Sequence, residues 1–194
     1  TAHVPYGARS DQEIRQLTAK AIEWLYRQGC KIAVVACNTA SAFSLDYLRD
    51  HYGERFPIVG LVPALKPAVI QTQSKVVAVL ATPATFRGQL IKDVIAKFAE
   101  PAGVNVLTVT NLELVPFVEA GQEMSPACLK VLQQILQPVV EQGADYLVLG
   151  CTHYPFLKQA IHQIFAEKLK LIDSGQAVAR KNNYILIFIA QVSK

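Results

Sequence analysis

Hydrophobic residues recur at helical spacing over the first part of the chain. Ser10 and Glu13 form a capping-box pattern, and apolar positions then repeat every three or four residues as far as Gly29. This pattern predicts a helix between Ser10 and Gly29. The next segment, KIAVVA, is short, apolar and partly β-branched, which predicts a buried strand. After Cys37 the helical spacing returns and continues to about Tyr52, so a strand, a turn and a helix follow in order.

The same order of strand and helix is repeated further along the chain. The strand patterns are KVVAVLATP, VNVLTV and ADYLVLG, and the helical patterns after them cover residues 84–98, 113–120 and 155–165. Strands that alternate with helices in this way are typical of parallel sheets covered by helices. We therefore expect an α/β fold with parallel sheets.

Two stretches match each other in position, QGCKIAVVACNT and QGADYLVLGCTH. Each begins with a Gln-Gly pair where a helix should end, and Cys37 follows Gly29 at the same spacing of eight positions as Cys151 follows Gly143. Both cysteines are therefore expected at the carboxyl end of a buried strand and at the mouth of a helix, where open α/β sheets bind ligands. We expect two pseudo-symmetric parallel-sheet domains, with both thiols directed at an active site in the cleft between them.

Composition narrows the classes of function. The chain has 194 residues, a hydrophobic share of 52% and a mean hydropathy of +0.25. No apolar run approaches the ~18 residues that a membrane helix needs, and the net charge of +4 comes without a dense Lys/Arg block. We therefore expect a cytoplasmic globular protein with reduced thiols that binds neither membrane nor nucleic acid. The first residues, TAHVPYGARS, have no initiator Met and no targeting pattern, which suggests the interior of a longer protein.

The four cysteines differ in their expected roles. Cys30 and Cys128 do not lie at a strand-to-helix turn, so we interpret them as small buried hydrophobic residues. Cys37 and Cys151 have polar neighbours that are poor choices for a dry core, which favours a functional role. Cys151 and His153 are the only closely spaced metal-ligand types, and without a second pair the sequence predicts no metal site.

Two thiols at helix mouths suit one kind of chemistry. The unpaired N–H groups and the positive end of the helix dipole can bind a carboxylate, and they lower the pKa of a nearby thiol from its ordinary value of about 8.5. When two thiols flank a bound carbon atom, one can remove a proton from one face while the other delivers a proton to the opposite face. This inverts the carbon without a cofactor, and the titration then belongs to the coupled pair.

Seven segments carry a family signature: VPYG, ACNTASA, VGLVPALKPA, LATPAT, LVPFVEAG, GCTHYPFL and LIDSG. Together they resemble bacterial glutamate racemase, over residues 1 to about 180. ACNTA and GCTHYP are shared by the wider aspartate/glutamate racemase superfamily, whereas PYG, VPxxKP and the VE after LVP point to the glutamate racemases. The resemblance implies cofactor-independent interconversion of L- and D-glutamate, which supplies D-glutamate for peptidoglycan synthesis and hence for cell-wall biogenesis and cell shape.

The resemblance also implies roles for individual residues. Cys37 and Cys151 would be the two catalytic acid/base residues, and Glu119 and His153 would assist the thiols and orient the substrate amine. The residues that would contact the amino acid are Tyr6, Gly7, Asn38, Thr39, Thr82, Thr85, Thr152 and His153.

Domain boundaries follow from the same resemblance. The first α/β domain would comprise residues 1–62 and 172–194, and the second residues 63–171. The family begins with a strand and an Asp-Ser-Gly turn whose Asp supports the first cysteine, and we expect that segment to be missing here. The apolar run 184–190 departs from the family pattern and is expected to be an added strand or an altered C-terminus.

Partners and alternatives complete the expectations. The LVPALKP segment resembles the form of the family that a peptidoglycan precursor activates, and a homodimer is a further possibility. The alternatives are a racemase for aspartate or a hydantoin, a pyridoxal-phosphate racemase, and a non-catalytic fragment or binding module, since some glutamate racemases are thought to bind DNA gyrase. A pyridoxal-phosphate enzyme would have to use Lys66, which lies in an expected hinge without a phosphate-binding glycine loop.

Overall fold

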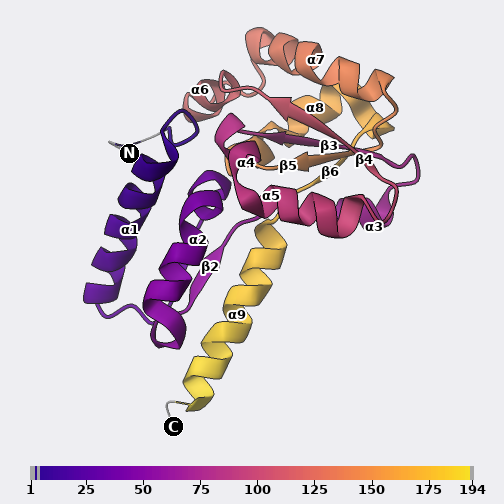
Figure 1. The fold of residues 1–194 in the computed structure, drawn as a ribbon. Coiled ribbons are helices and arrows are strands. Elements are labelled where there is room, and N and C mark those ends of the chain that lie inside the picture. Colours follow the sequence, from indigo (N-terminus) through magenta and orange to yellow (C-terminus); the bar gives the residue numbers. More distant parts are fainter. Residues whose placement is uncertain (1–2, 4, 193–194) are drawn as a thin grey trace.

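The structure, a computed structural model, describes residues 3 and 5–192 and contains two parallel sheets (Figure 1). One is two-stranded with the order β1-β2, and the other is four-stranded with the order β4-β3-β5-β6. All of the strand pairs are parallel. The expected α/β architecture is therefore confirmed. Within the described part of the chain, no helix is both long and apolar enough to cross a membrane.

The first part of the fold holds the two-stranded sheet. Its elements are α1 (Asp11–Arg27), β1 (Ala33–Val35), α2 (Asn38–Tyr52), the 3₁₀-helix η1 (Gly53–Arg55) and β2 (Ile58–Gly60). The second part holds α3 (Leu65–Gln71), β3 (Val76–Ala81), α4 (Pro83–Arg87), α5 (Gln89–Val94), the π-helix η2 (Ile95–Ala99), β4 (Asn105–Thr110), α6 (Leu114–Glu119), α7 (Pro126–Glu141), β5 (Tyr146–Leu149), the 3₁₀-helix η3 (Tyr154–Leu157), α8 (Lys158–Phe165), the 3₁₀-helix η4 (Ala166–Lys168) and β6 (Lys170–Ile172). The last helix, α9 (Gly175–Val192), runs back beside β2 (Figure 1).

The predicted capping box starts α1 as expected. The Glu13 N–H donates to the Ser10 hydroxyl at 3.3 Å, and the Ser10 N–H donates to the Glu13 carboxylate at 3.0 Å. The predicted helix after Cys37 also forms, as α2. These two helices lie side by side in the first part of the molecule (Figure 1).

Strand β3 is buried on both faces of the larger sheet. Ala78 and Leu80 pack into the core formed with α7 and α8, whereas Val77 and Val79 pack into the core formed with α3 and α5. Figure 1 shows these two pairs of helices on opposite sides of the sheet. A parallel strand covered on both faces needs apolar side chains at successive positions, and this explains the uninterrupted run VVAVLA.

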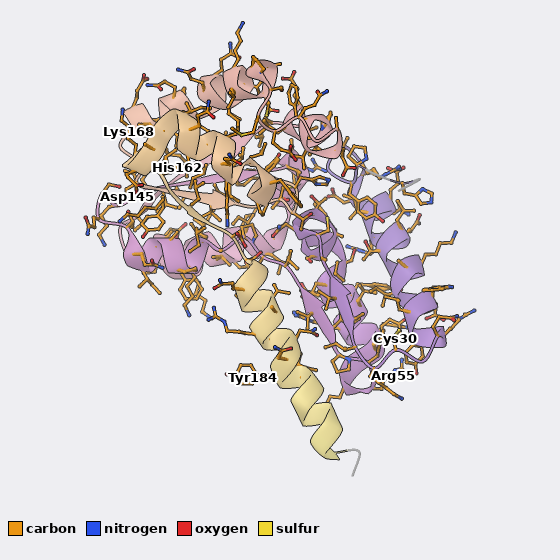
Figure 2. The ribbon with its side chains drawn as sticks, turned by 180° about the vertical axis from the view of Figure 1, so that it is seen from behind. Cys30, Arg55, Asp145, His162, Lys168 and Tyr184 are labelled. Carbon is orange, nitrogen blue, oxygen red and sulfur yellow. The ribbon has the colours of Figure 1, made fainter. Side chains whose placement is uncertain are left out.

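Three sequence-based expectations are wrong in detail. The single helix expected over 84–98 is divided, because Gly88 is extended and lies so close to α2 that a Cβ atom there would be 2.5 Å from the Ala42 Cβ atom. Of the two alternatives for 184–190, an added strand is wrong: the run is part of α9, since a continuous apolar run fits either structure. Cys30 is exposed rather than buried, because it lies in the turn before β1 begins at Ala33 (Figure 2). Cys128, by contrast, is fully buried as expected.

The Asp145 carboxylate connects the start of β5 to the loop before β3 through hydrogen bonds. It accepts hydrogen bonds from the Thr72 hydroxyl at 2.6 Å and from the N–H groups of Gln73 and Ser74 at 2.7 and 3.2 Å. Burial raises the pKa of Asp145, but these hydrogen bonds outweigh it and hold the pKa below its usual value of 3.8. The loop includes Lys75, whose φ of 62° lies in the left-handed region, so the carboxylate stabilises a backbone path that a lysine does not readily adopt.

Replacing Asp145 with alanine is expected to lower the free energy of unfolding by about 2 kcal/mol at neutral pH, because three donors lose their acceptor. The folded-state pKa lies below the unfolded one, so this stabilisation is complete above about pH 4 and is lost as the pH falls through the folded value. Urea unfolding at neutral and acidic pH measures the difference. Glu167→Ala, at an exposed acidic residue, is the control. An equal loss for Asp145→Ala at both pH values would contradict this account.

Candidate active site

Cys37 lies two residues after the end of β1 and caps the start of α2. Its Sγ atom accepts the Ala40 N–H at 3.4 Å, in the place where a serine or aspartate oxygen often caps a helix. The predicted position at a strand end and a helix mouth is confirmed. The expected lowering of its pKa is wrong: burial raises the pKa of the Cys37 thiol, and the hydrogen bonds from Ala40 and Thr39 offset only part of this rise.

Cys151 follows the carboxyl end of β5, as predicted. A turn at Thr152 and His153 and then the 3₁₀-helix η3 follow it, instead of the α-helix start that Cys37 has. Burial, together with a smaller effect of the neighbouring Cys37, raises the pKa of the Cys151 thiol to about 11, against the lowering effect of nearby backbone N–H groups. The two thiols are therefore close enough to influence each other, although their immediate surroundings differ.

A histidine and a carboxylate stand behind Cys151. The His153 Nδ1 atom lies 3.7 Å from the Cys151 Sγ atom, and the His153 Nε2 atom lies 2.5 Å from the Glu119 carboxylate. If Nε2 carries the proton and donates it to Glu119, Nδ1 is free to accept the thiol proton. Glu119 is the last residue of α6, so the packing of α6 against η3 brings this carboxylate to the imidazole. Cys37 has no such base among its described partners.

Most of the predicted residues line two neighbouring cavities. The first, of about 290 Å³, is lined by Pro5, Tyr6, Gly7, Thr39, Thr82, Leu112, Val115, Pro116, Glu119, Cys151 and His153. The second, of about 410 Å³, contains Cys37 and Thr152 in its lining, and Tyr6 lines both. The two thiols thus face adjacent cavities that share Tyr6.

Gly7 lies so close to Thr82 and Leu112 in the wall of the first cavity that a side chain does not fit there. A Cβ atom at this position would lie 3.0 Å from the Thr82 Cβ atom and 3.3 Å from a Leu112 methyl group. Any larger residue would push the loop that carries Tyr6 away from Thr82. The glycine therefore lets the N-terminal loop form one wall of the cavity.

Two of the predicted contact residues do not line either cavity. Asn38 is buried, and its Oδ1 atom has no hydrogen-bond partner among the described residues. Thr85 is buried behind Thr39 and Thr82, and its hydroxyl contacts both of theirs. Pattern analysis in turn missed the apolar wall made by Pro5, Leu112, Val115 and Pro116. Val115 and Pro116 belong to the LVPFVEAG segment, in which only the glutamate was predicted as a site residue.

Comparison with known proteins decides the family. The model of the Asp/Glu/Hydantoin racemase family matches residues 1–181 of the chain. The chain belongs to this racemase family. Among curated relatives, the glutamate racemase of Deinococcus radiodurans is 59% identical over 186 residues, which cover 96% of this chain and 63% of that protein. The glutamate racemase of Ralstonia pickettii is 46% identical over 178 residues, which cover 92% of this chain and 62% of that protein. The chain spans less than two thirds of the length of these two racemases.

Solved racemase structures share the fold. Escherichia coli glutamate racemase, in complex with L-glutamate and the activator UDP-MurNAc-ala, matches with a TM-score of 0.82 at 36% identity, over 95% of this chain and 69% of that chain. The Thermus thermophilus glutamate racemase, in complex with beta-chloro-D-alanine, matches with a TM-score of 0.75 at 32% identity, over 98% of this chain and 69% of that chain. The resemblance expected from the seven sequence segments is confirmed.

Proposed function

We propose that this racemase-family chain interconverts L- and D-glutamate without a cofactor, with Cys37 and Cys151 as the two acid/base residues. The observation that carries the proposal is the pair of half-buried thiols, each at the carboxyl end of a parallel strand in a different sheet and near enough to perturb each other. Relatives of the chain, at up to 59% identity, are named as glutamate racemases. Sequence, fold and thiol placement thus support the same reaction.

The proton moves in two steps. One cysteine thiolate removes the α-proton of glutamate and becomes a thiol, and the electron pair left behind spreads onto the α-carboxylate. The opposite thiol then delivers its proton to the other face and becomes the thiolate, so the number of protons on the pair is unchanged. A raised pKa makes each thiolate a stronger base, which suits a weakly acidic α-proton. His153 can take the Cys151 proton to generate the thiolate, with Glu119 stabilising the imidazolium.

The remaining side chains are proposed to bind the amino acid. Hydroxyl and N–H donors suit the two carboxylates, and the apolar wall suits the methylene groups between them. The unpartnered Oδ1 atom of Asn38 leaves an acceptor for the substrate ammonium if the side chain turns toward the cavity. The proposed contact residues are Tyr6, Gly7, Asn38, Thr39, Thr82 and Thr152.

Incubating the 194-residue chain with L-glutamate in heavy water tests the proposal. Loss of the α-proton signal and formation of D-glutamate are expected together, because inversion takes its new hydrogen from a thiol that exchanges with solvent. The rate on aspartate should be lower by at least about tenfold, since a pocket discriminates one methylene group by this much. Faster turnover of aspartate or a hydantoin, or no exchange on any of them, would overturn the proposal. Proton NMR and chiral chromatography supply the two readouts.

The cellular setting is proposed from the family. We infer a cytoplasmic enzyme that supplies D-glutamate for peptidoglycan, with residues 1–62 and 172–194 forming one domain and residues 63–171 the other. The E. coli relative was solved with an activator, UDP-MurNAc-ala, and the LVPALKP segment of this chain, which resembles the activated form of the family, supports a similar activator here. Adding UDP-MurNAc-Ala to the glutamate assay tests that regulation, and size-exclusion chromatography tests the proposed homodimer.

A further inference from the structure

Three buried threonine hydroxyls meet at the wall of the first cavity. The Thr39 Oγ1 atom lies 2.8 Å from the Thr82 Oγ1 atom and 3.2 Å from the Thr85 Oγ1 atom, and the last two atoms are 3.0 Å apart. The three residues are between 2% and 6% exposed, so the hydrogen bonds among them are shielded from bulk water. We call this set the hydroxyl ring. Because Thr39 belongs to α2 and the other two belong to the start of α4, the ring joins the two parts of the fold.

Thr85 differs from the other two members of the ring. Thr39 and Thr82 line the first cavity, whereas Thr85 does not. Among the described residues, the Thr85 hydroxyl contacts only these two hydroxyls. Its backbone N–H also donates to the Thr82 Oγ1 atom, at 3.2 Å. A bound ligand or a reacting thiol can therefore be affected by the Thr85 hydroxyl only through the ring.

Counting hydrogens shows how the ring responds to Cys37. Three hydroxyls have three hydrogens, so a closed ring uses all of them and Thr39 has none left for the Cys37 sulfur. When Thr39 donates to a Cys37 thiolate instead, the hydrogens of Thr82 and Thr85 can both point at the Thr39 oxygen. Hydrogen bonds donated to the Thr39 oxygen polarise the Thr39 O–H group and make it a stronger donor. A stronger donor stabilises a negatively charged sulfur more than a neutral one.

We propose that Thr85 is a positioning residue that acts through Thr39 to stabilise the thiolate form of Cys37. The inference rests on the proposed function for the role of Cys37, but the effect of Thr85 on the thiol does not depend on catalysis. Hydrogen bonding from the Thr39 side chain lowers the pKa of Cys37, and Thr39 lies in the first turn of α2, two residues after the cap at Cys37. The other titratable groups that face Cys37 are Cys151, His3 and Tyr6. The α1 residues that line the cavity beside Cys37 are uncharged, so no helix charge competes with this effect.

The rate at which iodoacetamide alkylates Cys37 and Cys151 tests the proposal, because the thiolate is the reactive form. Peptide mass spectrometry resolves the two sites over a pH series from about 7 to about 11. Thr85→Val removes the hydroxyl and keeps the shape of the side chain. The midpoint for Cys37 is expected to rise by about one pH unit, which slows its alkylation about tenfold at neutral pH. The midpoint for Cys151 should not rise, because a Cys37 that ionises less readily raises the pKa of Cys151 less.

Two further variants make the result decisive. Thr85→Ser keeps the hydroxyl and should keep the parent midpoint. Thr85→Ala removes the hydroxyl without keeping the methyl groups, so it should reproduce the valine result, and it replaces that variant if the valine protein does not fold. An unchanged Cys37 midpoint, or an equal shift at both cysteines, would overturn the proposal. Alkylation needs no turnover, so a failure of the racemase proposal would be seen separately, in the heavy-water assay.

Discussion

Cys37→Ser and Cys151→Ser are each expected to lower the rate of glutamate inversion by about 10³-fold or more, because a serine hydroxyl cannot act as the acid or base at one face. The two thiols lie at equivalent strand ends in separate sheets, so neither can take over the position of the other. Chiral chromatography of the product from either enantiomer measures the loss. The full effect should appear with each single substitution, since inversion needs both faces.

Cys30→Ser is the matched control for the cysteine variants. Cys30 is free and exposed in the turn after α1, at the outer end of the first part (Figure 2), and it lines neither cavity. Its replacement should leave the inversion rate within about twofold of the parent, as for most surface substitutions. Undiminished inversion in either the Cys37 or the Cys151 variant would exclude the two-thiol mechanism.

Glu119→Gln is expected to lower turnover by about 10²-fold with a smaller change in KM. The Glu119 carboxylate holds His153 in the orientation that directs Nδ1 at the Cys151 sulfur, and in the proposed mechanism it stabilises the imidazolium formed when His153 takes the thiol proton. Glutamine keeps the size of the side chain but removes the negative charge. Steady-state rates with each enantiomer, measured as a function of pH, report the effect.

The control for this variant is Glu113→Gln, at an exposed position just before α6. Its side chain lines neither cavity, so turnover should not change. Loss of turnover in both variants would show a general sensitivity of α6 to charge. Equal turnover for Glu119→Gln and the parent would show that His153 does not depend on the carboxylate.

Local patterns predicted those parts of the site that depend on a strand and the turn after it. The spacing from Gly29 to Cys37 and from Gly143 to Cys151 placed both thiols correctly, because strand length and helix start are local properties. The pKa of each thiol could not be predicted in this way. A helix start lowers it, but the burial that raises it comes from residues distant in the sequence, such as those lining the cavities.

Contacts between distant segments account for the other differences. The break at Gly88 is needed because Ala42 of α2 lies against it, and helical periodicity within 84–98 carries no information about α2. The hydroxyl ring joins Thr39 to two threonines more than 40 positions away. Its members could be predicted as polar residues near the site, but only the packing of α4 against α2 shows that Thr85 lies behind the cavity wall.

The chain passes between the two parts of the fold twice, through residues 61–64 after β2 and residues 173–174 after β6. Two covalent connections allow one part to rotate about the line that joins them, whereas sliding or full separation would strain both. Widening of the space between Thr39 and Thr82 by such a rotation breaks the hydrogen bonds that join α2 to α4. On the proposed role of the hydroxyl ring, such an opening would hold Cys37 more firmly as the neutral thiol, so opening the space and ionising the thiol would need different arrangements of the two parts.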